Sequence, residues 1–144
     1  MSEEKVIFEK IDENAKLPER QHPNDAGYDL YSSENLVLKV GEIKSVGTGL
    51  RAKLPENIEG QIRPRSGLSL SGITVMNSPG TIDPGYRGEI KVIMGNLLGE
   101  DKKIKKGDRI AQIVFAPIRH PEITWGRLDE TDRGDGGFGS TGVR

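Results

Sequence analysis

The chain has 144 residues, of which 21 are basic and 22 are acidic, giving a formal net charge of −1. This balance excludes the basic surface of a general nucleic-acid binder, although a local basic cluster is still able to hold a small anion. The absence of cysteine excludes disulfides, thiolate catalysis and cysteine-ligated zinc. Because neither a secretory signal nor an apolar stretch of about 20 residues is visible, we expect a cytoplasmic domain without nucleic-acid or membrane partners.

The length fits one domain, and a hydrophobic fraction of 33% allows a single core of modest size. This modest fraction leaves room for a partner copy to complete part of the apolar surface. The 19 glycines and 8 prolines are typical of many short strands joined by turns.

Short β-rich runs recur along the chain between turn signals such as Val40-Gly41. The runs predicted as strands are residues 6–8, 36–40, 43–50, 58–63, 89–94 and 110–118. Ile90, Val92 and Met94 share one face of the fifth run, while the sixth is apolar on nearly both faces and is therefore expected between two sheets. A short helix is predicted after Ser66, with this serine as its N-cap. The predicted architecture is an all-β sandwich or jelly roll.

The last residues of the chain differ in composition from the rest. Residues 129–144 are rich in glycine and contain only Phe138 and Val143 as large apolar side chains, too little to bury for a self-supporting fold. We therefore predict a β-sandwich domain over residues 1–128 and a flexible arm over residues 129–144. A frayed tail is the alternative, but a tail without function needs neither Phe138 nor Arg133.

Several familiar motifs do not indicate a function here, because the surrounding sequence lacks the features that they require. Residues 134–139 match the dinucleotide-binding pattern GxGxxG, but neither the required strand nor the required helix is predicted around them. An adhesion tripeptide, residues 133–135, has little meaning in a cysteine-free chain expected inside the cell, and no GxxxxGK[ST] phosphate loop is present. His22 and His120 are too distant in sequence, without a third nitrogen ligand nearby, to indicate a zinc site.

Five segments carry polar groups that a plain sandwich does not need. In residues 26–30, Asp29 interrupts a strand-like run, and alone it indicates a turn residue. In residues 64–69, Pro64 ends a strand and Ser66 and Gly67 direct backbone N–H groups outward beside Arg65. This arrangement is typical of an anion site, although a plain helix cap explains it equally well.

The third segment, residues 77–88, is the most informative. Pro84-Gly85 predicts a type II turn that holds Asp83 and Tyr86 close together. Asn77 offers both a donor and an acceptor suited to the edge of a base. A polar hairpin explains the turn, but it does not explain why a carboxylate, an amide and an aromatic ring occur together.

The fourth segment, residues 107–112, places Gln112 within an apolar strand, where the amide needs a specific structural or ligand partner. The fifth is the glycine-rich segment from Arg133 to Gly142.

In this order, the five segments resemble the five motifs of the trimeric dUTPase family, from Ala26 to Gly142. The resemblance implies a jelly roll that assembles as a homotrimer with shared active sites. It implies hydrolysis of dUTP to dUMP and pyrophosphate with Mg²⁺, which limits uracil in DNA and supplies dUMP for thymidylate synthesis. In this family Asp29, Ser66 and Gln112 come from one subunit, Asp83 from a second and the arm from a third.

The same resemblance implies a role for each matched residue. Asp83 becomes the general base that activates water, and Asp29 holds magnesium through coordinated waters. The residues implied to contact the phosphates are Arg65, Ser66, Gly67, Gln112, Arg133, Gly139, Ser140 and Thr141. Those implied to contact the base and sugar are Asn77, Thr81, Ile82, Tyr86, Lys91 and Phe138.

Independent chemical reasoning supports these roles. A carboxylate in a turn, shielded by Ile82 and Tyr86, is able to accept a proton as water attacks the α-phosphorus. Uracil and cytosine differ by exchange of an acceptor for a donor, so the hairpin backbone, which cannot flip, is expected to read uracil together with Asn77. A tight hairpin excludes the 5-methyl of thymine, Tyr86 leaves no space for a 2′-hydroxyl, and Phe138 stacks on the base.

Two other functions are alternatives. The dCTP deaminase family has a similar fold and turn but resembles this chain less. It uses a glutamate at the position of Ile93, has a tryptophan in place of Tyr86, and lacks the glycine-rich tail. A non-catalytic nucleotide-binding module is disfavoured by Asp83, since a carboxylate weakens simple binding of a polyanion.

Overall fold

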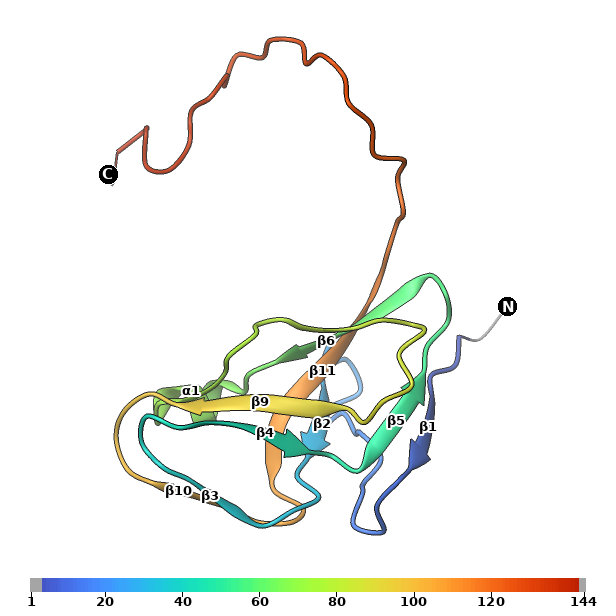
Figure 1. The fold of residues 1–144 in the computed structure, drawn as a ribbon, viewed down its shortest axis with the longest axis vertical. Coiled ribbons are helices and arrows are strands. Elements are labelled where there is room, and N and C mark those ends of the chain that lie inside the picture. The colour runs from blue at the N-terminus through green and yellow to red at the C-terminus, as the bar shows by residue number, and fades with distance from the viewer. Residues whose placement is uncertain (1–3, 143–144) are drawn as a thin grey trace.

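The computed structural model describes residues 4–142, so the first three residues of the predicted body and the last two of the predicted arm lie outside it. Figure 1 shows strands packed in two main layers. One sheet has the strand order β2-β11-β6-β8, the other has the order β4-β9-β7, and two-stranded ladders join β1 to β5 and β3 to β10. The elements are β1 (Ile7–Lys10), β2 (Tyr28–Tyr31), β3 (Leu36–Leu38), β4 (Ile43–Gly47), β5 (Leu50–Lys53), β6 (Ile58–Arg63), α1 (Ser66–Leu70), β7 (Ile73–Val75), β8 (Gly80–Ile82), β9 (Lys91–Asn96), β10 (Lys102–Ile104) and β11 (Arg109–Pro117).

The strand pairing confirms the predicted all-β jelly roll. Three antiparallel pairs are nested: β2 with β11, β3 with β10 and β4 with β9. As the chain advances from β2 to β4, the partner strands run backward from β11 to β9. Such nesting arises when one long antiparallel ribbon is rolled into two sheets.

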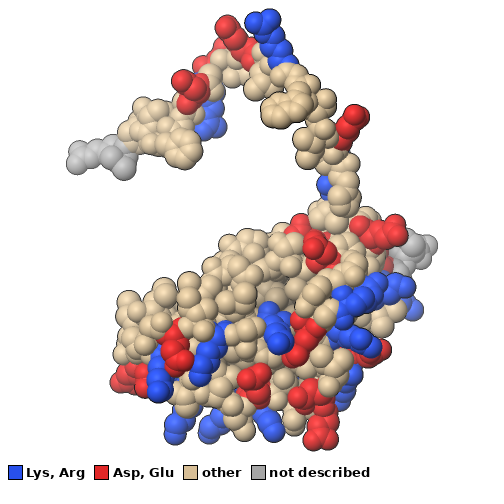
Figure 2. Space-filling view, viewed as in Figure 1, with Lys and Arg blue, Asp and Glu red and all other residues tan. Residues whose placement is uncertain are grey.

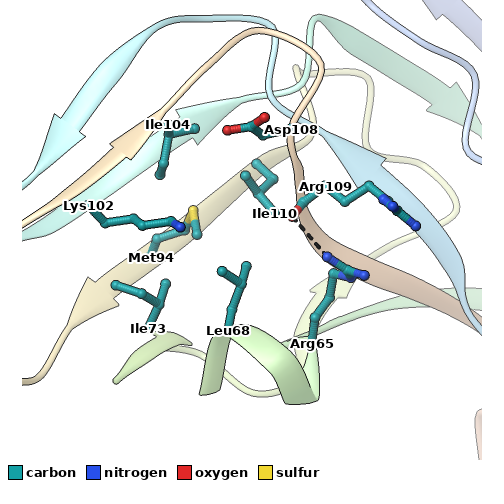
Figure 3. Close-up of a pocket in the computed structure, with 9 residues that line it drawn as sticks. All are labelled: Arg65, Leu68, Ile73, Met94, Lys102, Ile104, Asp108, Arg109 and Ile110. Atoms are coloured by element: carbon teal, nitrogen blue, oxygen red, sulfur yellow. Dashed lines mark hydrogen bonds between the residues drawn. The ribbon is translucent and has the colours of Figure 1, made fainter. Parts of the chain in front are cut away.

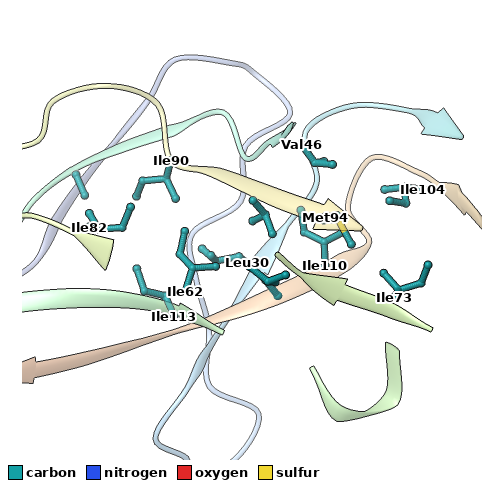
Figure 4. Close-up of a cluster of buried hydrophobic side chains, with 14 of the residues drawn as sticks. Leu30, Val46, Ile62, Ile73, Ile82, Ile90, Met94, Ile104, Ile110 and Ile113 are labelled. Carbon is teal, nitrogen blue, oxygen red and sulfur yellow. The ribbon is translucent and has the colours of Figure 1, made fainter. Parts of the chain in front are cut away.

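The core lies between the two sheets, where alternate residues of each strand point inward. Figure 4 shows aliphatic side chains of both layers in contact there. Ile90, Val92 and Met94 are almost completely buried, as their shared face predicted. Ile110 and Ile113 of β11 are also buried, but the prediction that this strand lies between two sheets was wrong, because β11 is an inner strand of one sheet and Val114 and Ala116 are only half-buried.

Some local predictions were wrong. The run at residues 43–50 is divided into two strands, because Gly49 has a φ of 71° and turns the chain. Strands β7, β8 and β10 were not predicted, since three residues each give too short a pattern. The helix occurs where expected, but Arg65 is its N-cap and Ser66 its first residue, because Arg65 still has an extended backbone.

The chain leaves the body at the end of β11 and arches away from it (Figure 1). Among the described residues, no hydrogen bond joins residues 119–142 to the body, and Ile123 and Trp125 are more than nine-tenths exposed. The predicted boundary at residue 128 stays a prediction. No helix in the described part of the chain is long and apolar enough to cross a membrane.

Candidate active site

The predicted site residues of the body lie in two pockets that share no lining residue. The first, which we call the hairpin pocket, has a volume of about 320 Å³ and contains Asn77, Thr81, Ile82, Asp83, Tyr86 and Lys91, with Ser45, Ile62, Gly80, Glu89 and Ile93. The second, which we call the arginine pocket, has a similar volume and contains Asp29, Arg65, Ser66, Gly67 and Gln112, with Gln21, Asp25, Ala26 and Gly27. The sequence motifs thus meet in two groups rather than one.

In the hairpin pocket, a tight turn presents Asp83. The Tyr86 N–H donates to the Asp83 carbonyl at 3.1 Å, which closes the predicted turn. The turn is not of type II, however, because Gly85 lacks the positive φ that this type requires. The guanidinium of Arg87 donates to the carbonyls of Pro84 at 2.8 Å and Tyr86 at 3.2 Å, and so braces the turn from outside.

The carboxylate of Asp83 is open to solvent. Ile82 is buried, but the residue Asp83 is exposed and Tyr86 is 44% exposed, so the predicted shielding by these neighbours is incomplete within one chain. Among the described residues, Asp83 forms no ion pair. A carboxylate that is held in place but unpaired is free to accept a proton.

In the arginine pocket, Asp29 is 9% exposed and lies at the centre of a polar cluster. The amide of Gln21 donates to Asp29 Oδ2 at 2.7 Å. Arg65 Nε lies 3.7 Å from Oδ1, and an Arg109 guanidinium nitrogen lies 3.8 Å from Oδ2. Asp29 therefore holds two cations beside the pocket and is not the isolated turn residue that its local sequence indicates; it lies within β2.

Gln112 faces Asp29 across the pair of strands β2 and β11. Its amide nitrogen donates to the Pro64 carbonyl at 3.0 Å, which provides the specific partner that a half-buried glutamine needs. A Cβ at Gly27 would lie 3.0 Å from Gln112 Cδ and 3.2 Å from its Cβ, so only glycine leaves space for this amide.

The electrostatic surroundings of Asp29 also affect Tyr31, two residues along β2. Burial, together with the charges of Glu19 and Asp29, raises the pKa of the Tyr31 hydroxyl, while Arg109 and Arg65 oppose this shift. The phenol is therefore neutral at physiological pH and adds no charge beside the pocket.

Behind the arginine pocket lies a separate cavity of about 250 Å³ between α1 and strands β9 to β11. Figure 3 shows its aliphatic floor and the hydrogen bond from Arg65 to the Arg109 carbonyl, which measures 3.3 Å. Helix α1 has no buried residue and lies beside this cavity. The side chain of Arg65 thus contacts β2 and β11, while its carbonyl accepts a hydrogen bond from the Ser69 N–H of α1 at 3.0 Å.

The arm residues predicted to contact substrate lie in neither pocket. Successive turns bend the arm from Thr131 onward, and Arg133 Nε donates to the Gly136 carbonyl at 2.8 Å. Phe138 has a φ of 51°, a left-handed conformation that costs a non-glycine residue about 1–2 kcal/mol, and its ring is fully exposed. Gly139, Ser140 and Thr141 continue beyond it, also away from the body.

Strand register shows how far apart the two pockets are. Asp29 pairs with Gln112, Gln112 with Arg63, and Gly80 with Ile62, so Asp83 falls at the level of Ala116. Asp29 and Asp83 are separated by three strand spacings and four residues along the strands, or about 20 Å between backbones. The two carboxylates therefore lie far apart within one chain.

Sequence reasoning missed several residues of these pockets. Gln21 lies in an irregular loop, where no pattern connects it with Asp29. Arg109, which contacts Asp29 beside the arginine pocket, lies within the recognised segment 107–112, and its place in that segment was the available signal. Ser45 enters the hairpin pocket because β4 pairs with β9, whereas Glu89 directly follows the third segment, residues 77–88.

The donor set suits a hydrated divalent cation better than a protein cage. The described residues contain no group of three or more His, Cys, Asp or Glu side chains able to hold a metal. Asp29 and Asp25 are the carboxylates of the arginine pocket, and both arginine contacts of Asp29 are longer than 3.5 Å. Mg²⁺, which keeps several waters and is commonly held by one or two carboxylates plus phosphates, fits this arrangement.

A jelly roll with a free carboxylate in one pocket and an arginine cluster in another defines a class of all-β proteins equipped to bind and process a small anionic ligand. The chain matches the dUTPase family model over residues 13–142 and belongs to that family. It is 52% identical to a deoxyuridine 5′-triphosphate nucleotidohydrolase of Clostridium kluyveri, over 96% of this chain and 98% of the relative. It is 51% identical to the enzyme of that name from Clostridium acetobutylicum, over 95% and 96% of the two chains.

Solved structures agree with this family. A dUTPase mutant of Staphylococcus bacteriophage 80alpha with dUpNHpp is 30% identical, with a TM-score of 0.90 over 96% of this chain and 99% of the phage chain. A dUTPase mutant of phage phi11, described with a structural Mg(II) ion, is 29% identical, with a TM-score of 0.79 over 88% and 99% of the two chains.

Proposed function

We infer that the chain hydrolyses dUTP to dUMP and pyrophosphate and thus acts as a dUTP diphosphatase in nucleotide metabolism. The observation that carries this function is the match to dUTPases across residues 13–142, at about half identity to the nucleotidohydrolases named above. By removing dUTP, the enzyme limits incorporation of uracil into DNA and supplies dUMP for thymidylate synthesis.

Asp83 is the general base. Its carboxylate takes a proton from the water that attacks the α-phosphorus, and pyrophosphate leaves. The support is geometric: Asp83 lies in a closed turn at the hairpin pocket and forms no ion pair with any described residue. Closure of the site by neighbouring chains would exclude bulk water from around this exposed carboxylate.

The arginine pocket binds the phosphates. Arg65 offers a charged fork for phosphate oxygens, Ser66 and Gly67 offer hydroxyl and backbone donors, and Gln112 offers its remaining amide hydrogen. Asp29 orients Arg65 and Arg109 and would hold Mg²⁺ through coordinated waters, which would supply charge neutralisation on the phosphate chain.

The hairpin pocket reads the base and the sugar. Backbone groups between Asn77 and Asp83, including Thr81 and Ile82, recognise uracil together with the Asn77 amide, and Lys91 contributes from β9. Tyr86 packs against the deoxyribose. Phe138 stacks on the base when the arm closes, a contact worth about 1–3 kcal/mol. Arg133, Gly139, Ser140 and Thr141 then contact the terminal phosphates.

The enzyme is a homotrimer whose sites are each built by three chains. The support is the separation of about 20 Å between Asp29 and Asp83, which favours a site whose two pockets come from different chains. The arm makes no hydrogen bond to its own body among the described residues, so it is available to reach a neighbour.

A second observation supports chain-to-chain contact beside the hairpin pocket. Residues 66–82 contain no charged side chain, although 30% of the chain is charged, and the run includes exposed Leu70 and Met76. Figure 2 shows an uncharged area at the upper left of the body, over the segment that follows α1. Depletion of charge is typical of an interface core.

Ile93 argues against deamination of dCTP. It lines the hairpin pocket beside Asp83, and its aliphatic side chain cannot transfer a proton. A non-catalytic binding module is disfavoured by the high identity to nucleotidohydrolases along nearly the whole chain.

Incubation of the purified protein with dUTP and Mg²⁺, followed by pyrophosphate detection, tests the function directly. We expect equimolar dUMP and pyrophosphate from dUTP, little product from UTP or dTTP, and no ammonia from dCTP. Release of ammonia would instead support a deaminase, and binding of dUTP without product would support a binding module.

A further inference from the structure

The ring of Tyr86 is folded back against its own backbone. Its hydroxyl donates to the Glu89 carbonyl at 2.9 Å, so the ring spans the two residues between them. A Cβ built at Gly88 would lie 2.5 Å from Tyr86 Cζ and 2.8 Å from Cε1, and closer still to the hydroxyl oxygen. Real side chains do not approach so closely, so this ring position exists only because residue 88 is glycine.

The carbonyl that receives the hydroxyl belongs to a fixed segment. The carboxylate of Glu89 accepts a hydrogen bond from the Gly49 N–H at 3.1 Å. The next residue, Ile90, donates to the Leu50 carbonyl at 2.7 Å, and its own carbonyl accepts from the Thr48 hydroxyl at 2.6 Å. The Tyr86 ring is thus tied to the turn between β4 and β5 and not merely to a mobile loop.

We propose that Gly88 is a specificity-determining residue, because it allows the Glu89 carbonyl to fix the Tyr86 ring where that ring excludes a 2′-hydroxyl. Gly88 acts only through Tyr86 and is a positioning residue. A freely rotating tyrosine would leave room for ribose, whereas a ring fixed at both ends presents one surface to the sugar. The proposal rests on the proposed hydrolysis of dUTP, with Tyr86 beside the sugar.

Gly88 differs from its neighbour Gly85 in a way that gives a matched control. Neither glycine has a positive φ, so alanine is compatible with the backbone at both positions. A Cβ at Gly85 would meet no atom within 4 Å, whereas one at Gly88 collides with the Tyr86 ring. Gly88→Ala and Gly85→Ala therefore make the same chemical change within one loop, but only the first displaces the ring.

The test measures kcat/KM for dUTP and for UTP in the full-length wild type, Gly88→Ala, Gly85→Ala and Tyr86→Phe. For Gly88→Ala we expect the ratio of dUTP to UTP to fall by about tenfold or more, because the ring loses its place. Tyr86→Phe, which removes only the hydroxyl bond, should lower the ratio about three- to tenfold. Gly85→Ala should keep the wild-type ratio.

A role confined to stability would lower activity toward both nucleotides equally and leave the ratio unchanged. The proposal is therefore wrong if both Gly88→Ala and Tyr86→Phe keep a ratio within twofold of the wild type. If Gly88→Ala does not fold, as judged by thermal unfolding, Tyr86→Phe alone decides. Absence of dUTP hydrolysis in the wild type would overturn the proposed function instead, so the two failures are distinguishable.

Discussion

The hairpin pocket and the arginine pocket each contain one aspartate of the proposed site, but in opposite states. Asp29 is almost buried, accepts a hydrogen bond from Gln21 and lies within 4 Å of two guanidinium groups. Asp83 is exposed and forms no ion pair with any described residue. A carboxylate that is already paired serves to orient charge, whereas an unpaired one is able to take up a proton.

The difference also shows what each pocket lacks. The arginine pocket has positive charge but no free base, and the hairpin pocket has a free base but Lys91 as its only lining lysine or arginine. The two are complementary halves rather than two copies of one site. The following experiments test this division of roles.

The largest effect is expected for Asp83→Asn. Asparagine keeps the shape of the side chain but cannot accept the proton from water, so kcat should fall on the order of 10²- to 10⁴-fold. Nucleotide affinity, measured by calorimetry with dUpNHpp, should change little. Turnover close to the wild-type value would show that the base lies elsewhere.

A second experiment tests whether one site combines Asp83 and the arm from different chains. A truncation lacking everything after Asp132 and the Asp83→Asn variant should each be nearly inactive alone, for different reasons. When they are unfolded and refolded together at equal amounts, about three-quarters of trimers should be mixed. Each mixed trimer has one site that takes Asp83 from a truncated chain and the arm from a full-length chain, so about a quarter of all sites should recover.

The control for this experiment is each variant refolded alone, with mixed assembly verified by mass spectrometry. If the arm served the chain that supplies Asp83, no combination would repair a site. Background activity after verified mixing would therefore refute the shared site and leave the family membership intact.

Asp29→Asn should have an intermediate effect that differs in kind from that of Asp83→Asn. Loss of an outer-sphere magnesium partner should lower activity about 10- to 100-fold and raise the Mg²⁺ concentration needed for half-maximal rate. Affinity for dUpNHpp without Mg²⁺ should be preserved or increased, because one negative charge near the phosphates is removed. An unchanged Mg²⁺ titration would show that Asp29 only orients the arginines.

The smallest effect is expected for Gly27→Ala, which crowds the Gln112 amide without altering any charge. Overpacking of this kind costs about 1 kcal/mol or more, so kcat/KM for dUTP should fall at least about fivefold. Gly126→Ala, where a Cβ meets no atom within 4 Å, is the control. Equal activity of both variants would show that Gln112 does not need its observed position.

Long strands were predictable from the sequence, whereas short strands were not. The runs that became β9 and β11 were long enough to predict strands, and the alternation in the first of them also predicted its buried face correctly. Strands β7, β8 and β10 have three residues each and are specified mainly by their partners, which a local pattern cannot include. The helix after Pro64 was predicted, but its cap was misplaced by one residue because Arg65 caps without a side-chain hydrogen bond.

For the site, the polar residues were recognisable from sequence, while their grouping was not. Asp29 and Gln112 are 83 positions apart in the chain and face each other only because β2 pairs with β11. Asp83 is separated from both by the register of β6 and β8, which no motif spacing encodes. Gln21 belongs to the site through its contact with Asp29, and Gly88 through its contact with the Tyr86 ring. Neither contact follows from a pattern in the sequence.

The distance between Asp29 and Asp83 has a consequence for how this enzyme responds to its own concentration. If the two carboxylates can serve one substrate only across a subunit boundary, an isolated chain has no complete site, however well it is folded. Catalytic capacity then follows mass action among chains, and nucleotide that bridges them favours assembly in the same way that any ligand favours the state it binds. Dilution would switch the enzyme off, and substrate would oppose that loss.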